Sequence, residues 1–523
     1  MNRNTKPTPN DRRPQATTYK TVLSFRLAVA LVALAVVAVA TGILTFGRTV
    51  STQYAGPQRA KAAANGTVQE AKPATVLVYM NGSDLESAAG EASSDISEML
   101  KSGIGNNANV IIQTMGTQQW QDHNIASDHT QRFAVKNGEL SLVDDTLGQL
   151  DTTDPKTLSD FIRWSVENYP AERYMLVLWN HGAGPVYGFG YDEWQGDYAA
   201  LTLNEMQQAL KENSDVHFDF IGMDCCIMSS LETYHVLQPF CDYAILSEDF
   251  EPGVGWSYAN WMRMLENDPT TDTVTLGKTV VDDMIAAVKE DPENGDATLA
   301  LVDESAIPAL YNAWIDFAYE NKDALLGTNY SQEISQRGRF VRYKPNGHGE
   351  AYNGNGFGQY PDGYAQPYAD NGYGQYPGDN YGQPSQPNQD AYGWYGTDEW
   401  YDMWDSDMSY VTLSDYYVTD IMSVANSINS TKAAALKSAM EKAVVYFGKT
   451  SGETNMAGIS VTLPYGDSEF YQQLVEVFKA CGIDSNYVDW LGQFVEAAGA
   501  DDYYSYDAQP SGYDMQLGYQ FAA

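Results

Sequence analysis

The chain has 523 residues and a formal net charge of −39, from 69 acidic and 30 basic residues. So large an acidic excess repels phosphate backbones and argues against a nucleic-acid partner. The four cysteines are too few for a disulfide scaffold, while 43% hydrophobic residues suffice for a sizeable core.

An uncharged stretch at residues 27–47, rich in Ala, Val and Leu, follows the basic segment 1–26. It is long enough to cross a bilayer, and its positive flank predicts that segment 1–26 lies in the cytoplasm. We therefore expect a single-pass anchor in the cell membrane, with the rest of the chain extracytoplasmic. A cleaved signal sequence, giving a secreted protein, is the alternative, because Ala38-Val39-Ala40 resembles a cleavage site. The anchor is favoured because the apolar stretch continues past that site.

Residues 48–73, rich in Ala, Gln, Gly and Thr, are typical of a linker. Beyond them, short apolar runs alternate with amphipathic segments. In chain order we expect a strand at 75–80, a turn at 81–84, a helix to about residue 100, a strand at 109–113, a helix opened by Asp154-Pro155, a strand at 175–179, a helix at 203–210, a strand at 218–223, a helix through Leu231 and Leu237, and a strand at 243–246. This alternation predicts an α/β fold with a mostly parallel sheet covered on both faces.

Residues 345–408 break the pattern, because Tyr, Gly, Gln, Pro, Asn and Asp dominate there. Such a composition cannot fill a core and predicts a disordered insertion. Folded character returns at 410–413 and continues through a helix at 433–443 and a strand at 458–463. We therefore expect one domain, 74–500, interrupted by a low-complexity insertion and followed by an acidic, Tyr-rich tail at 501–523.

Two of the predicted strands are each followed by a reactive side chain. His181 comes just after the strand at 175–179, and Cys226 comes just after the strand at 218–223. Open α/β sheets place their chemistry at this edge, and a histidine and a cysteine are the minimum parts of a thiol nucleophile and its base. Cys225 competes with Cys226 for the nucleophile's place. We also expect the helix after Cys226 to begin there, so that its N-terminus favours the thiolate.

The neighbours of these residues suggest further roles. Gly182 lets the backbone approach a ligand closely, and an N–H group at that point can stabilise an oxyanion. Asp224 is either a turn or capping residue, or a carboxylate that pairs with a cationic substrate side chain. The spacing of cysteines and histidines suggests no zinc site, and the chain carries no P-loop or dinucleotide fingerprint. We therefore expect no metal and no required cofactor.

Several segments together resemble the clostripain-like cysteine peptidases. The resemblance covers about residues 74–343 and resumes weakly over 409–496. The segments are Tyr79–Glu86 (YMNGSDLE), similar to the family's opening strand and turn; Trp179–Gly184 (WNHGAG), similar to its histidine motif; Asp224–Met228 (DCCIM), similar to its nucleophile motif, usually Asp-Ala-Cys-Leu-Met; and Ser247-Glu248 with Pro252–Trp256 (PGVGW), similar to the segment that follows.

The resemblance implies a caspase-like α/β/α sandwich and a role for each motif residue. It makes Cys226 the nucleophile, with Cys225 in place of the usual alanine, and His181 the base. It assigns Gly182 and Cys226 to the oxyanion hole and Asp224 to the S1 pocket. It also implies cleavage after Arg or Lys, which an acidic pocket suits because a buried cation needs a carboxylate partner. A calcium requirement is compatible with the resemblance.

Members of the family commonly mature by self-cleavage between the histidine and the cysteine, and this chain departs from that pattern. No Lys or Arg occurs from residue 174 to residue 210, and Lys211 is the only one before Cys226. We predict activity as one uncut chain, or cutting at Lys211. Segment 345–431 and the chain after Lys479 also lack Lys and Arg, so the enzyme's own loop and tail carry no site. Compositional drift in a low-complexity segment explains this lack equally well.

The sequence thus predicts an extracytoplasmic cysteine endopeptidase acting on polypeptides with basic residues. In the linker, Arg59, Lys61 and Lys72 offer sites for release from the membrane. The alternative from another class is a catalytically inactive or weakly active, membrane-tethered surface-binding protein on the same scaffold. A hydrolase using the carboxylate pair Asp224 and Glu248 fits less well, because it gives the glycines after His181 no role. The sequence does not indicate an oligomeric state.

Overall fold

The computed structural model describes residues 71–195, 200–290, 295–327, 340–342, 350–352, 416–452 and 455–497, all within one compact unit of the chain. The predicted segments 1–26 and 27–47 and the tail 501–523 lie outside these residues, as do most of the linker 48–73 and of the insertion 345–408. Among the described helices, none combines the length and the apolar character needed to span a bilayer.

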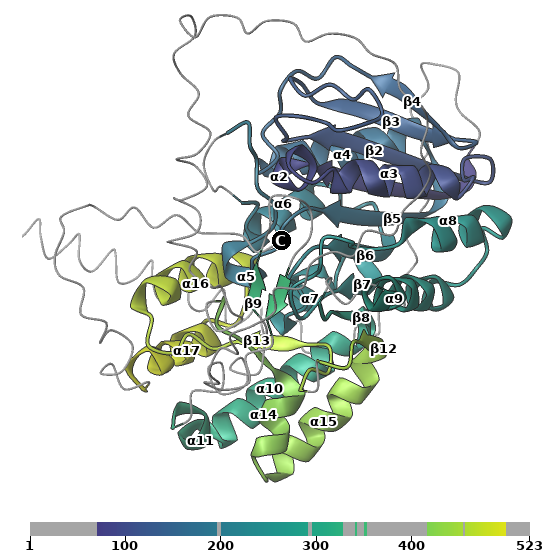
Figure 1. Ribbon diagram of the computed structural model, residues 1–523. Helices are drawn as coiled ribbons and strands as arrows, with labels where there is room; N and C mark the ends of the chain where they lie inside the picture. The colour runs from purple at the N-terminus through teal and green to yellow at the C-terminus, as the bar shows by residue number, and fades with distance from the viewer. Residues whose placement is uncertain are drawn as a thin grey trace, which may run out of the picture. The chain divides into compact units, whose positions relative to one another are not determined.

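A nine-stranded sheet forms the centre of the fold, in the order β12-β8-β7-β6-β5-β1-β2-β3-β4 (Figure 1). The strands from β7 to β2 pair in parallel, and those at both edges pair antiparallel. Their bounds are β1 Lys72–Asn81, β2 Ala108–Met115, β3 Gln131–Lys136, β4 Glu139–Asp144, β5 Ala171–Trp179, β6 Phe218–Asp224, β7 Cys241–Leu246, β8 Thr298–Asp303 and β12 Val444–Lys449. The predicted α/β fold with a mostly parallel sheet is confirmed.

Helices cover both faces of this sheet, which makes three layers. In β1, Leu77 and Tyr79 face one apolar core while Val76 and Val78 face the other, as the two-residue period of a strand requires. The helices on the first face are α4 Pro155–Asn168, α6 Leu203–Glu212, α7 Leu231–Leu237, α10 Ile307–Glu320, α14 Ile421–Ser427, α15 Thr431–Ala443, α16 Ser468–Cys481 and α17 Ser485–Ala497. Those on the second face are α3 Glu91–Lys101, α8 Tyr258–Asn267 and α9 Thr273–Glu290.

The chain after the insertion packs beside the turn that carries Cys226. The short strands β11 (Val418–Asp420) and β13 (Ser460–Thr462) pair antiparallel, and Ser460 N donates to Ser229 O at 3.0 Å. Tyr416, Val418 and Met456 share a small apolar cluster with Cys226. The remaining described elements are the short helices α2 Ser83–Ser87, α5 Gly184–Tyr187, η2 Glu304–Ala306 and α11 Lys322–Leu326, and a two-stranded ladder of β9 Phe340–Arg342 and β10 Glu350–Tyr352.

The structure differs from the sequence-based expectation in several places. Strands β8 and β12 and helices α8, α9, α10, α16 and α17 were not expected. The helix expected up to residue 100 is broken into α2 and α3: α2 ends at Ser87, and Gly90 at φ 75° is the N-cap of α3. The antiparallel edge pair β3 and β4 was not expected. The helix expected to begin at Cys226 begins at Leu231, where the Ser230 side chain accepts from Thr233 N. The predicted effect of a helix N-terminus on the Cys226 thiolate is therefore wrong.

Candidate active site

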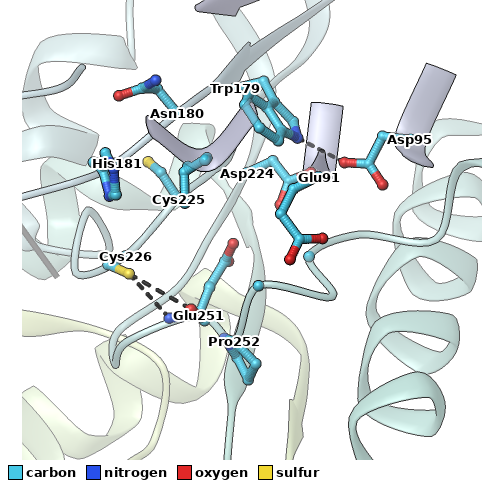
Figure 2. Close-up of a pocket in the computed structure, with 13 residues that line it drawn as sticks. Glu91, Asp95, Trp179, Asn180, His181, Asp224, Cys225, Cys226, Glu251 and Pro252 are labelled. Carbon is cyan, nitrogen blue, oxygen red and sulfur yellow. Dashed lines mark hydrogen bonds between the residues drawn. The ribbon is translucent and has the colours of Figure 1, made fainter. Parts of the chain in front are cut away.

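The sheet brings His181 and Cys226 to the same edge, as predicted. Strands β5 and β6 are parallel neighbours, and their last residues, Trp179 and Asp224, are partners in the register. Each reactive residue follows its strand by two positions. Figure 2 shows both side chains among the residues that line one pocket, together with Asp224 and Cys225.

Gly182 lies against the backbone of Cys226. A Cβ atom at position 182 would sit 2.0 Å from the carbonyl oxygen of Cys226 and 3.0 Å from the Cys225 sulfur. No side chain fits such an approach, so glycine is needed there for steric reasons. The two backbone segments predicted to form an oxyanion hole are therefore adjacent.

The Cys226 thiol is buried, with the residue 3% exposed, and contacts the backbone of Glu251. Glu251 N donates to the sulfur at 3.2 Å, and the thiol faces Glu251 O at 3.7 Å (Figure 2). Burial raises the pKa of this thiol, and the nearby Glu251 and Asp249 carboxylates raise it further, against the lowering effect of the Glu251 N–H. A thiol in this environment is neutral at rest, so it needs a base before it can attack.

The turn after the nucleophile is conformationally strained. Ile227 has φ 60° and is fully buried, and a β-branched residue in this region is a genuine outlier. Its N–H donates to Asp249 O at 3.0 Å, and Ser229 N donates to Ser247 O at 2.8 Å. The loop after β7 thus holds the turn in its unusual shape, and such retained strain is typical of functional sites.

Cys225 faces a different environment from its neighbour. It belongs to the large apolar core on the first face of the sheet, while Cys226 belongs to the small cluster near β11. Burial, followed by the Glu251 and Cys226 charges, raises the Cys225 pKa well above the ordinary value for a thiol. This placement is that of an inert core cysteine.

His181 contacts a carboxylate that sequence reasoning did not single out. Its Nε2 lies 2.8 Å from Asp84 Oδ1, with the histidine side chain 3% and the aspartate side chain 42% exposed. Burial by itself would raise the pKa of Asp84, but the charge of His181 and the hydrogen bond to it bring that pKa below the ordinary value. Asp84 follows β1, the strand next to β5, so the rule used for His181 and Cys226 could have found it.

The predicted substrate-binding residue Asp224 lines the same pocket. Its carboxylate accepts hydrogen bonds from Tyr258 Oη at 2.7 Å and from Trp256 N at 3.2 Å. Burial raises the pKa of Asp224 to about 6, against the lowering effect of these donors. The carboxylate is therefore ionised at neutral pH and is fixed in place beside the nucleophile.

Three further carboxylates line the same pocket and were missed from the sequence: Glu91, Asp95 and Glu251 (Figure 2). Glu91 and Asp95 stand one helical turn apart on α3, a spacing that could have indicated them. Asp95 Oδ2 accepts from Trp179 Nε1 at 2.7 Å. Burial, and then the charge of Glu86, raises the pKa of Glu91 to about 7.

Glu251 is the most unusual of these groups. The residue is 5% exposed, and its carboxylate oxygens meet no donor in good hydrogen-bond geometry, although Asp224 and Trp256 lie close enough to act on its pKa. Burial, and then the charge of Asp224, raises its pKa well above the ordinary value for a glutamate. Figure 2 shows its carboxyl group directed into the pocket, so the pocket contains a buried acid.

The carboxylate pair Asp224 and Glu248 does not form a site. Glu248 is absent from the pocket lining, and its Oε2 accepts from Gly458 N at 2.7 Å. It thereby anchors the segment before β13 rather than facing a ligand. Among the described side chains, no group of three or more His, Cys, Asp or Glu residues is arranged to hold a metal ion.

Comparison with known proteins places this geometry in a family. The model of the clostripain family matches residues 78–509. The chain belongs to the clostripain family. The resemblance drawn from short segments is thus confirmed. The match to curated clostripain of Hathewaya histolytica is 25% identical over 144 residues, which is 24% of this chain and 27% of that relative. The alignment thus spans about a quarter of the curated relative's length.

Two solved structures of the clostripain family resemble this one. A secreted cysteine protease from Bacteroides thetaiotaomicron, in complex with an irreversible peptide inhibitor, is 17% identical with a TM-score of 0.50; the match covers 79% of this chain and 100% of that one. An inactive zymogen from Parabacteroides distasonis is also 17% identical, with a TM-score of 0.48, over 82% of this chain and 99% of that one. At this identity the first likeness concerns the fold alone.

Proposed function

We propose that this clostripain-family protein is an endopeptidase that hydrolyses peptide bonds after Arg or Lys, with Cys226 as nucleophile and His181 as base. The observation that carries the specificity is the buried Glu251 carboxyl group, which lines the pocket beside the thiol and next to the Asp224 carboxylate. Its neighbour Asp224 is buried and held by fixed donors. A cationic side chain would give these buried carboxyl groups a partner of opposite charge.

Electrostatics explains why a basic side chain would bind there. Four carboxyl groups share one pocket, and burial raises the pKa of Glu91, Asp95, Asp224 and Glu251. A guanidinium or ammonium group lowers the cost of ionising them and supplies hydrogen-bond donors to their oxygens. An acidic or apolar side chain would offer these four carboxyl groups no positive charge, so ionising them would stay costly.

We expect the chemistry to run through His181, Cys226 and Gly182. His181 takes the proton from the Cys226 sulfur, and the thiolate attacks the carbonyl carbon of the bond to be cut. Backbone N–H groups of Gly182 and Cys226 stabilise the oxyanion that forms. His181 returns the proton to the leaving amine, which departs and leaves a thioester. Water, deprotonated by His181, then attacks the thioester, and the released thiolate recovers its proton.

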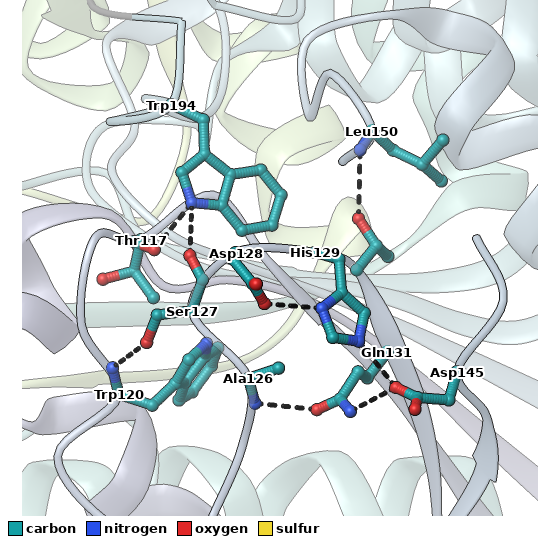
Figure 3. Close-up of polar contacts among 11 residues, drawn as sticks. Thr117, Trp120, Ala126, Ser127, Asp128, His129, Gln131, Asp145, Leu150 and Trp194 are labelled. Carbon is teal, nitrogen blue, oxygen red and sulfur yellow. Dashed lines mark hydrogen bonds and ion pairs between the residues drawn. The ribbon is translucent and has the colours of Figure 1, made fainter. Parts of the chain in front are cut away.

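We further propose that the chain acts without a cut between His181 and Cys226. The segment after His181 is tied down as far as Gln195: Trp194 Nε1 donates to Thr117 O at 2.7 Å and to Ser127 O at 3.0 Å (Figure 3). Lys211 lies within helix α6, where its Nζ donates to Gln207 Oε1 at 2.7 Å. A helical backbone is a poor protease substrate, because cleavage requires an extended, exposed segment.

The cellular location remains a prediction from the sequence. We propose action outside the cytoplasm, either on a membrane anchor formed by residues 27–47 or as a secreted protein, as the Bacteroides relative is named. Release by cutting at Lys72 is disfavoured, because Lys72 opens β1 and its Nζ donates to Gly105 O at 2.6 Å. Arg59 and Lys61 are the remaining release sites. Shedding that is unchanged after both become Gln would count against this route.

Fluorogenic peptides test the function directly. We expect thiol-dependent hydrolysis of Arg- and Lys-linked peptides, with none of Asp- or Leu-linked ones, measured under reducing conditions with and without calcium. Cys226→Ala abolishes the activity, while the matched variant Cys225→Ala retains it. Absence of hydrolysis by the folded wild type would favour the surface-binding alternative, and loss of activity in Cys225→Ala alone would reassign the nucleophile.

A further inference from the structure

The contact between His181 and Asp84 adds a third residue to the proposed pair of Cys226 and His181. Asp84 Oδ1 lies 2.8 Å from His181 Nε2, on the strand-end turn next to the one that carries the histidine. We infer that Asp84 is a positioning residue for the reaction, which completes a Cys226–His181–Asp84 triad. This inference rests on the proposed function, since it assumes that His181 is the base.

The hydrogen bond determines which nitrogen of His181 can act as base. An ionised carboxylate can only accept, so Nε2 must carry the proton in this contact. In the neutral ring Nδ1 then has the lone pair and can accept the proton from the thiol. Asp84 also stabilises the imidazolium that forms when the thiol is deprotonated, since opposite charges at this distance attract.

The turn that carries Asp84 is held firmly in place. Ser83 is fully buried and has φ 48°, a left-handed conformation that a serine adopts at an energetic cost. Its Oγ accepts from Asn180 Nδ2 at 3.0 Å, and Asn180 directly precedes His181. The turn after β1 and the end of β5 are thus joined at two consecutive residues, Asn180 and His181. The unusual backbone at Ser83 directs Asp84 to the imidazole.

A second anchor fixes helix α2 from its other side. Glu86 accepts from Ser93 N at 2.8 Å and from Gln121 N at 2.6 Å, so α2 is bound both to α3 and to the loop after β2. Asp84 is therefore a fixed contact rather than a mobile surface carboxylate. The other titratable groups that line the pocket with His181 are Glu91 and Asp95 from α3, Asp224, Cys225 and Cys226 from the end of β6, and Glu251 from the loop after β7.

Asp84→Asn tests the inference, with Asp242→Asn as matched control. Asp242 Oδ1 contacts His217 Nε2 at 2.9 Å, so the control also removes a carboxylate from a histidine, outside the pocket. We expect Asp84→Asn to lower kcat by about 10- to 100-fold, with KM within about twofold, as loss of proton-transfer assistance does. The pH profile of kcat/KM broadens, because the acid limb, set by the imidazole, moves to lower pH and the alkaline limb, set by the thiol, moves to higher pH. Asp242→Asn leaves both unchanged.

A second readout keeps the inference separate from the proposed function. The rate at which iodoacetamide alkylates Cys226, located by mass spectrometry, needs no substrate. We expect its midpoint to move to higher pH in Asp84→Asn but not in Asp242→Asn. If the wild type hydrolyses no peptide but the alkylation midpoint still differs between wild type and Asp84→Asn, the proposed function is overturned and the triad is retained.

Other outcomes would overturn the triad. These are a kcat within twofold of wild type, an unchanged pH profile, or an effect confined to KM, each measured on protein whose fold is checked by circular dichroism. If Asp84→Asn does not fold, Asp84→Glu decides the matter. We expect this variant to keep both limbs near the wild-type pH, since it keeps the carboxylate. If the two limbs of its pH profile are displaced as far as we expect for Asp84→Asn, the positioning role of the Asp84 carboxylate is contradicted.

Discussion

Trp179 and Asp224 are register partners at the last positions of β5 and β6, so the two strands end at the same height. His181 and Cys226 each follow two residues later and leave the sheet side by side. Met80, the last but one residue of β1, is likewise the register partner of Trp179, and Asp84 after this strand contacts the imidazole. Three neighbouring parallel strands thus supply one residue each to the site.

Gly182→Ala is expected to impair both activity and folding. The added Cβ would meet the carbonyl oxygen of Cys226 at 2.0 Å, so the two backbone segments must separate. Loss of one oxyanion donor costs about 100-fold or more in kcat, and overpacking costs about 1–3 kcal/mol of stability. Peptide hydrolysis and urea denaturation measure the two effects.

Gly103→Ala is the control for that substitution. Gly103 has φ 76° and nothing within 4 Å of an added Cβ, so alanine there brings backbone strain without a clash. We expect a stability loss of about 1 kcal/mol and full activity. Equal losses of activity in both variants would show that backbone strain, and not the approach of Gly182 to Cys226, is responsible.

Glu251→Gln is expected to lower activity and raise stability together. A buried carboxyl group beside the Asp224 carboxylate destabilises the enzyme, and the neutral amide relieves that cost. Removing the charge that receives the substrate cation should reduce kcat/KM for Arg-linked peptides by about 10- to 100-fold, as truncation of buried charge pairs does. Hydrolysis rates and the midpoint of thermal denaturation are measured for the variant and the wild type in one buffer at about pH 7.5.

Glu304→Gln is the matched control for this variant. Glu304 is 1% exposed, and neither of its carboxylate oxygens has a partner within the described structure, but it does not line the pocket. We expect the same gain in stability with unchanged hydrolysis. If Glu251→Gln instead keeps full activity on Arg-linked and Lys-linked peptides, Glu251 has no part in substrate recognition.

The central strands were predictable because they are buried on both faces and therefore form continuous apolar runs in the sequence. The edge strand β4 (ELSLVD) is half-exposed and polar, so its signal is weak. The start of α7 was misplaced because tertiary hydrogen bonds from Ile227 and Ser229 to the loop after β7 prevent a helix from forming at Cys226. No local pattern reports such contacts.

The residues of the site likewise fall into those that the local sequence indicates and those that only the tertiary structure shows. His181 and Cys226 were found because reactive side chains follow strong strands. Glu251 lies 25 residues after Cys226, in a loop whose fold returns its backbone to the thiol, and only the tertiary structure shows this. Glu91 and Asp95 belong to a helix that covers the second face of the sheet, and their exposure to the pocket depends on how α3 crosses that face.

Glu232 is expected to make the stability of the fold depend on pH. It is 1% exposed on α7, and burial raises its pKa to about 7, against the lowering effect of backbone donors that include Thr462 N. The folded state therefore binds this proton more tightly than the unfolded chain does. Its contribution to stability is present at low pH and is lost as the pH rises from about 4.5 to about 7.

Glu232→Gln removes this titration. The variant should be more stable than wild type by on the order of 2–3 kcal/mol at pH 8, and by little at pH 4.5, where the wild-type carboxyl group is protonated. Urea denaturation at both values measures the difference. A gain of equal size at both values would mean that the ionisation of Glu232 does not cause it.

The purified enzyme is expected to remain uncut between His181 and Cys226. The segment between them lacks Lys and Arg up to Lys211, and Trp194 fixes its middle to the loop after β2. Denaturing gels and mass spectrometry should find residues 182–225 intact both in active wild type and in Cys226→Ala, and Lys211→Gln should leave hydrolysis unchanged. Cys226-dependent cleavage between Gly182 and Leu210 that accompanies the onset of activity would contradict this prediction, because a basic-specific enzyme has no site there.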